Sequence, residues 1–169
     1  MTRRAVVQKW ILYSLCALAL VLVQSLLLVR VQVWGVHPFL LPAIAVIPVT
    51  LERDEGALLF SVFFGLACDL LTPVAGLPCF YALAFLVSGG LAWLLSGRVV
   101  AAGLVCSLAA AASALVVCGV LHLAVLAGSQ SVDVTAAAVL AGKEAALSLP
   151  LTVLVHYPFR RICLLTQRD

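Results

Sequence analysis

Long apolar runs, separated by short charged or turn-forming stretches, fill almost the whole sequence. A helix that crosses the hydrocarbon core of a bilayer uses about 20 residues of this kind. The chain is 65% hydrophobic and only 10% charged, whereas a soluble domain has roughly 45–50% apolar and about 25% charged residues. Such a chain cannot cover a globule with water-compatible side chains. We therefore predict an all-α, polytopic membrane protein, folded as a compact bundle of about six transmembrane helices.

The charged clusters and turns mark the ends of the predicted spans. A basic head leads into an apolar run that is too long for a signal peptide, so we expect it to be retained as the first span. The second span contains Pro38, Pro42 and Pro48. Because proline interrupts the backbone hydrogen bonds, we expect this span to be kinked and buried against its neighbours. We predict a single membrane domain over residues 1–169, with spans over about 10–29, 34–51, 56–71, 79–95, 99–127 and 143–159.

The start of the last span has two interpretations. A helix that begins near Val134 places Lys143 and Glu144 near mid-bilayer, where a charge costs about 2.5–3.5 kcal/mol. Alternatively, residues 134–142 form a short helix on the outer surface, and the span begins near Lys143. We favour the second interpretation, because it lets both charged side chains reach the interface.

Basic residues are distributed unevenly between the two sides of a six-span chain. Only Arg30 and, with a late start of the last span, Lys143 fall on the outer side. Since positive charge stays in the cytoplasm, we predict that both termini are cytoplasmic. No basic patch is large enough to bind nucleic acid. The other eight of the ten Lys and Arg residues fall on the side of the termini: Arg3, Arg4, Lys9, Arg53, Arg98, Arg160, Arg161 and Arg168.

Asp69 is the one acid inside a clearly defined predicted span, roughly one turn before a Pro-Gly turn. An ionisable residue in a span is a functional hypothesis by default. We favour a structural role, in which the carboxylate accepts hydrogen bonds from amides of the following turn or pairs with Arg30 or His37. The alternatives are an interaction surface, or coupling to an ion or a substrate.

Lys143 and Glu144 are adjacent, so they do not face each other on a helix, and we expect each to find a separate partner or water. Glu144 and Ser148 lie one turn apart and could form a polar stripe toward another helix. The sequence contains no nucleophile–base motif or Walker loop, and its histidines and cysteines lack ligand-like spacing. We therefore predict no catalytic residue, no metal site and no cofactor.

Small residues are abundant in the predicted span over 99–127. They allow close approach of helices in lipid, where packing drives association. We favour packing inside the chain, and the alternative is a docking face for a partner's transmembrane helix.

The stretch from Gly65 to Leu83 contains a Gly-x-x-x-Asp-Leu-Leu element, formed by Gly65 and Asp69 with the two following leucines. A short turn with Gly76-Leu77 follows, and then a helix rich in small and apolar residues. This stretch resembles the rod shape-determining protein MreD family. The basic N-terminus, the short second and third spans and the Arg-rich end agree with the resemblance.

The resemblance implies a non-enzymatic subunit of the bacterial inner membrane that serves the elongation machinery for peptidoglycan. Its expected partners are MreC and, in a larger complex, MreB, RodA and a class B penicillin-binding transpeptidase, together with membrane lipids. The implied six-helix arrangement is similar to that of the substrate-binding subunits of ECF transporters. A small-molecule (vitamin) transport subunit, with an outer pocket near Asp69, Arg30 and Trp34, is therefore the alternative. The candidate interaction residues are Asp69, Arg30, Gly65, Gly76, Lys143 and Glu144.

Overall fold

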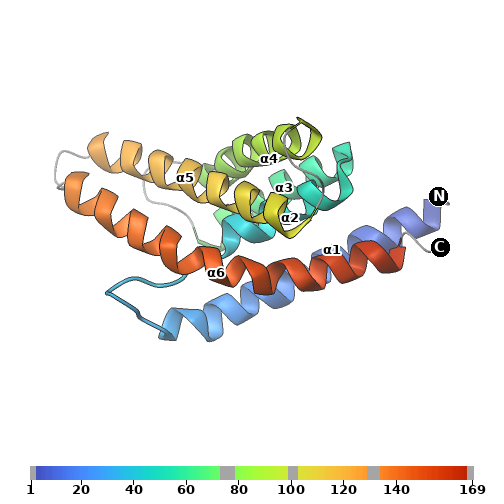
Figure 1. Cartoon of the computed structure of the whole chain (residues 1–169), viewed down its shortest axis with the longest axis horizontal. Helices are drawn as coiled ribbons and strands as arrows, with labels where there is room; N and C mark the ends of the chain where they lie inside the picture. Colours follow the sequence, from blue (N-terminus) through green and yellow to red (C-terminus); the bar gives the residue numbers. More distant parts are fainter. Residues whose placement is uncertain (1–2, 73–78, 99–102, 129–133, 167–169) are drawn as a thin grey trace.

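A computed structural model describes residues 3–72, 79–98, 103–128 and 134–166 of the chain. Over these residues the protein is all-α, as predicted, and its only β-type pairing is an isolated bridge between Val33 and Val36. The helices are α1 (Arg3–Leu26), the short 3-10 helix η1 (Leu28–Arg30), α2 (Leu41–Glu52), α3 (Glu55–Leu71), α4 (Phe80–Arg98), α5 (Leu104–Gly128) and α6 (Val134–Thr166) (Figure 1).

Three stretches of helix are long and apolar enough to cross a membrane: Val6–Arg30, Leu104–Gly128 and Thr135–Thr166. In the apolar part of the first stretch, only 11% of the residues are buried inside the protein. A helix that exposes so much apolar surface needs lipid or a partner around it. The helices over Leu41–Glu52 and Phe80–Ser96 are apolar but shorter.

Helix α2 is the centre of the molecule and contacts every other α-helix. All its residues from Leu41 to Thr50 are buried, which agrees with the expected burial of the second span. A helix that is apolar on all sides is stable only inside a core. Around α2, helix α4 packs against both α3 and α5, while α1 and α6 run side by side along one edge (Figure 1).

The prediction of one helical span over 34–51 is wrong in its first part. Trp34 and Gly35 lie in a turn with positive φ, and the chain is not helical again until Leu41. Pro38 and Pro42 explain the late start, because proline lacks the N–H of a helical ladder and restricts the residue before it. Non-helical backbone at membrane depth is tolerated only inside protein or against water.

The predicted break before Lys143 is absent, because α6 is one continuous helix from Val134 to Thr166. Residues 134–142 therefore form its first turns and not a separate surface helix. Pro150 and Pro158 lie inside this helix.

The small residues of α5 are covered by the protein's own helices. Ser107, Ala110, Ala111 and Ala114 are all buried, at the spacing of one helix face. This face packs within the bundle, where α5 contacts α2, α4 and α6. The alternative of a docking face for a partner helix is therefore wrong for this side of α5.

Candidate functional site

Gly65 and Asp69 join α3 to the beginning of α4, one helical turn apart. A Cβ atom on Gly65 would lie 2.7 Å from both the Cα of Ala82 and the carbonyl oxygen of Tyr81, so only glycine permits this approach. The Asp69 carboxylate accepts hydrogen bonds from the backbone N–H groups of Tyr81 and Ala82, each at 2.9 Å. These amides belong to the first turn of α4, where the N–H groups have no acceptor within their own helix. Asp69 thus caps α4 from α3.

Asp69 accepts hydrogen bonds from backbone amides, as predicted, but the donors belong to the first turn of α4 and not to the turn directly after α3. The predicted ion pair with Arg30 or His37 is absent among the described residues. Arg30 has an exposed side chain at the end of η1, and within the described residues it forms no ion pair with Asp69. His37 is also exposed, and within the described residues it too forms no ion pair with Asp69. Gly76, the remaining glycine of the motif, lies outside the described residues.

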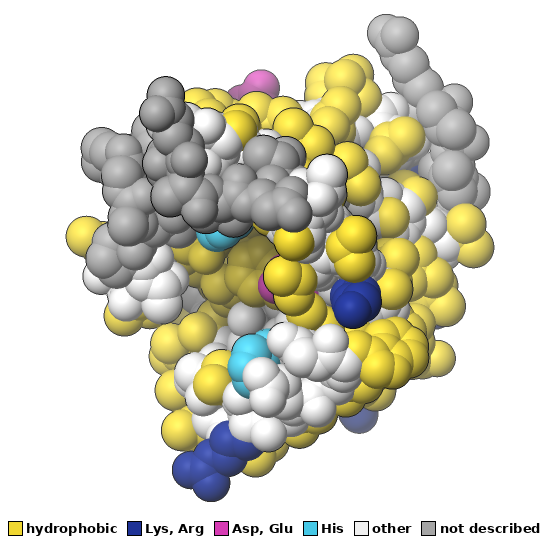
Figure 2. All heavy atoms as spheres, turned by 90° about the vertical axis from the view of Figure 1, so that its left-hand side faces the viewer, with side chains coloured by type: hydrophobic (Ala, Val, Ile, Leu, Met, Phe, Trp, Pro, Cys, Tyr) yellow, Lys and Arg dark blue, Asp and Glu magenta, His cyan; other side chains and the backbone are white. Residues whose placement is uncertain are grey.

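A cavity of about 290 Å³ opens between α4, α5 and α6. Figure 2 shows the end of the molecule where these helices meet, a mainly hydrophobic surface with a hollow and a few histidine and charged side chains. We call this space the Glu144 cavity. Its walls are mostly apolar and aromatic: Phe39, Phe80, Tyr81, Leu115, Cys118, Gly119, His122, Leu123, Leu126, Ala137, Leu140, Ala141, Glu144 and Ala145.

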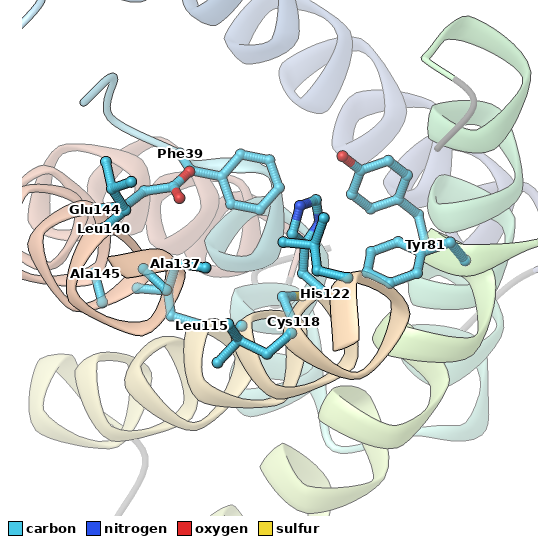
Figure 3. Close-up of a pocket in the computed structure, with 14 residues that line it drawn as sticks. Phe39, Tyr81, Leu115, Cys118, His122, Ala137, Leu140, Glu144 and Ala145 are labelled. Atoms are coloured by element: carbon cyan, nitrogen blue, oxygen red, sulfur yellow. The ribbon is translucent and has the colours of Figure 1, made fainter. Parts of the chain in front are cut away.

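The aromatic side of the cavity is assembled from three parts of the chain. Phe39 precedes α2, Phe80 and Tyr81 begin α4, and His122 lies on α5 (Figure 3). The ring centroids of Phe39 and Tyr81 are 6.2 Å apart, those of Phe80 and Tyr81 5.3 Å, and those of Phe80 and His122 6.1 Å. These distances are typical of stabilising aromatic contacts.

Hydrogen bonds hold two of these rings in place through their backbones. The Asp69 cap fixes the backbone of Tyr81. The backbone N–H of Phe39 donates to the hydroxyl oxygen of Ser148 at 2.8 Å, and the hydroxyl of Ser148 donates to the carbonyl of Glu144 at 2.6 Å. Ser148 does face another part of the chain, as the predicted polar stripe requires, but its partner is the non-helical segment before α2 and not a helix.

Lys143 and Glu144 separate as expected for neighbours on a helix. Lys143 is exposed, whereas Glu144 is partly buried and lines the cavity, with its carboxylate near the Phe39 ring in Figure 3. Within the described residues the Glu144 carboxylate has no hydrogen bond and no salt bridge. Asp69, Arg30 and Trp34, near which the alternative places its pocket, do not line the Glu144 cavity.

A second polar cluster, the Lys9 network, lies at the opposite end of the bundle. The ammonium of Lys9 lies 2.8 Å from a carboxylate oxygen of Glu52 and 3.5 Å from one of Asp54, and the hydroxyl of Tyr13 donates to Glu52 at 2.8 Å. The side chains of Lys9 and Glu52 are 6% and 8% exposed. Asp54 also caps α3 by accepting from the N–H of Ala57. The charged run over residues 52–55 is visible in the sequence, but nothing in it indicates Lys9 as the partner of Glu52.

A third cluster joins α2, α5 and α6 in the core. Nδ1 of His156 and the hydroxyl of Ser107 are 2.9 Å apart, and the hydroxyls of Ser107 and Thr50 are 3.1 Å apart. Nε2 of His156 is buried without a hydrogen-bond partner among the described residues. Sequence reasoning missed this cluster, because its members are far apart in the chain.

The described residues contain no group of three or more His, Cys, Asp or Glu side chains that could hold a metal ion. Their polar clusters cap helices, pair buried charges and shape one cavity. No family model, no curated protein and no solved structure matches the chain.

Proposed function

We propose that this chain is a non-enzymatic scaffold subunit of the bacterial rod complex, which links cell-wall synthesis to the cytoskeleton and maintains cell shape. The observation that carries the proposal is the contact made by Gly65 and Asp69. Gly65 and Asp69, two residues of the motif that carries the resemblance to MreD, join α3 to α4. A motif used for helix packing supports a protein that works through helix contacts and not through chemistry.

In this proposal the chain spans the inner membrane six times, with both termini in the cytoplasm. Helix α1 begins and α6 ends at the same end of the molecule, which supports an even number of spans (Figure 1). Arg160 and Arg161 lie near that end of α6, in agreement with a cytoplasmic position. Helix α2 is only about 18 Å long, but it is buried from lipid and need not match the bilayer thickness.

We place the transmembrane helix of MreC on α1. This helix exposes apolar side chains along most of its length, and a shallow groove of about 490 Å³ runs beside Trp10. Ser14 is exposed in that groove, and a small hydroxyl residue favours close helix association in lipid. MreB, RodA and a class B penicillin-binding transpeptidase would join through the larger complex.

A photo-reactive phenylalanine analogue at Leu15, in the groove, tests this docking. Val116 on α5 is the matched control, because the two side chains are 57% and 62% exposed. We expect a cross-link to MreC from position 15 and none from position 116. A cross-link from position 116 alone would show that the α1 assignment is wrong.

Depletion of the protein in its rod-shaped host tests the function as a whole. We expect rounded cells and loss of MreC from the purified membrane complex. Unchanged cell shape together with unchanged recovery of MreC and RodA would overturn the scaffold proposal.

A further inference from the structure

We propose that the Glu144 cavity binds a small organic cation, an amine or a quaternary ammonium compound. This is a binding function separate from the scaffold role, because the cavity lies between α4, α5 and α6 and the proposed MreC groove lies on α1. The argument rests on the charge of the cavity, on its aromatic wall, on its size and on how firmly its wall is held.

The charge of the cavity selects for a cation. Glu144 is the one acid that lines it, and its carboxylate has no ion pair or hydrogen bond within the described residues. A partly buried carboxylate without a partner is costly, and a bound cation would supply the missing counter-charge. His37 is exposed and His122 lines the wall, and neither forms a hydrogen bond or an ion pair with Glu144 within the described residues. Lys143 is exposed and is not part of the lining.

The aromatic wall favours an organic cation over a metal ion. Phe39, Phe80 and Tyr81 line the space, and the ring of Tyr81 is in contact with the rings of both Phe39 and Phe80. Aromatic rings attract ammonium groups through their negative faces, and clusters of such rings recognise quaternary ammonium ligands. A hard metal ion instead needs several oxygen ligands, and no group of three acidic, histidine or cysteine side chains is present among the described residues.

The size of the cavity limits the ligand. Its volume of about 290 Å³ corresponds to roughly ten water molecules at about 30 Å³ each, and it lies at the small end of the range for ligand pockets. A molecule with one ring or a short chain fits this space.

The wall is held in place before any ligand arrives. Asp69 fixes the backbone at Tyr81, and Ser148 fixes the backbone at Phe39. Ser148 also lies one turn from Glu144 on α6, so the acid and one of its aromatic neighbours share an anchor. Preorganisation of this kind lowers the entropy cost of binding.

Equilibrium dialysis of the purified full-length protein in detergent tests the proposal, with radiolabelled benzyltrimethylammonium as the probe. We expect saturable binding at one site per chain, with competition by unlabelled phenethylamine and tetramethylammonium. Phenylacetate, which has a similar ring but a negative charge, is the matched ligand control and should not compete.

The matched variants are Glu144→Gln and Lys143→Gln. Each removes one charge from neighbouring positions of α6, but only Glu144 lines the cavity. We expect Glu144→Gln to weaken the binding by roughly tenfold or more, and Lys143→Gln to leave it unchanged. Phe39→Leu should weaken binding several-fold while keeping the charge.

Two results would overturn the proposal. One is the absence of saturable binding of all three cations by folded wild-type protein at concentrations up to roughly 1 mM, the weak limit of specific binding. The other is competition by phenylacetate as strong as that by phenethylamine. The second result needs no variant, so it stands even where a substitution harms folding. Recovery of MreC by either variant reports on the scaffold proposal separately.

Discussion

At the scale of single residues, the contact between the end of α3 and the start of α4 uses one missing side chain and one carboxylate. Gly65 brings α3 against the backbone of α4, and Asp69 then reaches the free amides of its first turn. Neither residue acts alone, because the carboxylate is within reach only when the helices are this close. The motif is therefore a packing device whose two halves are one helical turn apart.

Gly65→Ala should destabilise the protein by about 1–3 kcal/mol, as overpacking of a closed interface does. The added methyl group would meet backbone atoms of Tyr81 and Ala82, which cannot rotate away. Gly90→Ala is the matched control, because an added Cβ at that position of α4 has nothing within 4 Å. Alanine there should be neutral or stabilise the helix by up to about 1 kcal/mol. Unfolding in a titration with sodium dodecyl sulfate measures both, and equal losses would contradict the close-approach account.

Asp69→Leu should lower the folded yield and the unfolding temperature more than Asp69→Asn does. Leucine leaves two amides of α4 without an acceptor, at about 1–3 kcal/mol for each buried group. Asparagine retains one oxygen and can still accept from Tyr81 or Ala82. Thermal unfolding of the purified variants in one detergent measures the difference. Equal unfolding temperatures would show that the hydrogen bonds to α4 contribute nothing.

The sequence predicted what Asp69 does but not where its partners lie. A carboxylate near a helix end, just before a turn, is typical of capping, and that inference needs only local sequence. Tyr81 and Ala82 follow after a turn whose path the sequence does not specify. The partner of Ser148 is harder still, because Phe39 is 109 residues away in the chain. Such contacts depend on the packing of whole helices.

At the scale of elements, side chains of one helix accept hydrogen bonds from the backbone of another segment or form an ion pair with it. Gln24 of α1 accepts from the N–H of Leu40, beside the Ser148 contact, so two helices serve the non-helical segment before α2. The prolines predicted that the second span is irregular and buried. They could not predict its twelve-residue length, because the start of α2 depends on these acceptors from α1 and α6.

The Lys9 network should tie α1 to α2, and its loss should be costly. Lys9→Ala leaves Glu52 buried without its cation, and removal of one partner of a buried pair typically costs about 3–5 kcal/mol. The double variant Lys9→Met with Glu52→Gln removes both charges and should be more stable than Lys9→Ala alone. Glu55→Gln, at an exposed acid beside the network, should change stability by less than about 0.5 kcal/mol. Detergent unfolding of the four proteins gives these values, and a mild Lys9→Ala phenotype would mean that water reaches Glu52.

At the scale of the whole molecule, the two polar ends differ in kind. One end carries the start of α1, the end of α6 and the Lys9 network, and the other end carries the Glu144 cavity. The distribution of Lys and Arg predicts which end faces the cytoplasm, because positive charge is retained there. The sequence could not predict the cavity, because its lining comes from four separate parts of the chain.

Labelling with a membrane-impermeant maleimide should distinguish the two ends in intact cells. Cys79 is exposed at the beginning of α4, near the cavity, whereas Cys163 is 6% exposed near the end of α6. In a variant that keeps Cys79 as its only cysteine, we expect labelling from outside the cell. A second variant has no native cysteine and carries Leu165→Cys, at a side chain that is 57% exposed near the end of α6. It should react only after the membrane is permeabilised. Labelling of both variants from outside would contradict an arrangement in which α4 begins on the side opposite to the end of α6. Labelling of the Leu165→Cys variant alone from outside would reverse the orientation predicted from the basic residues.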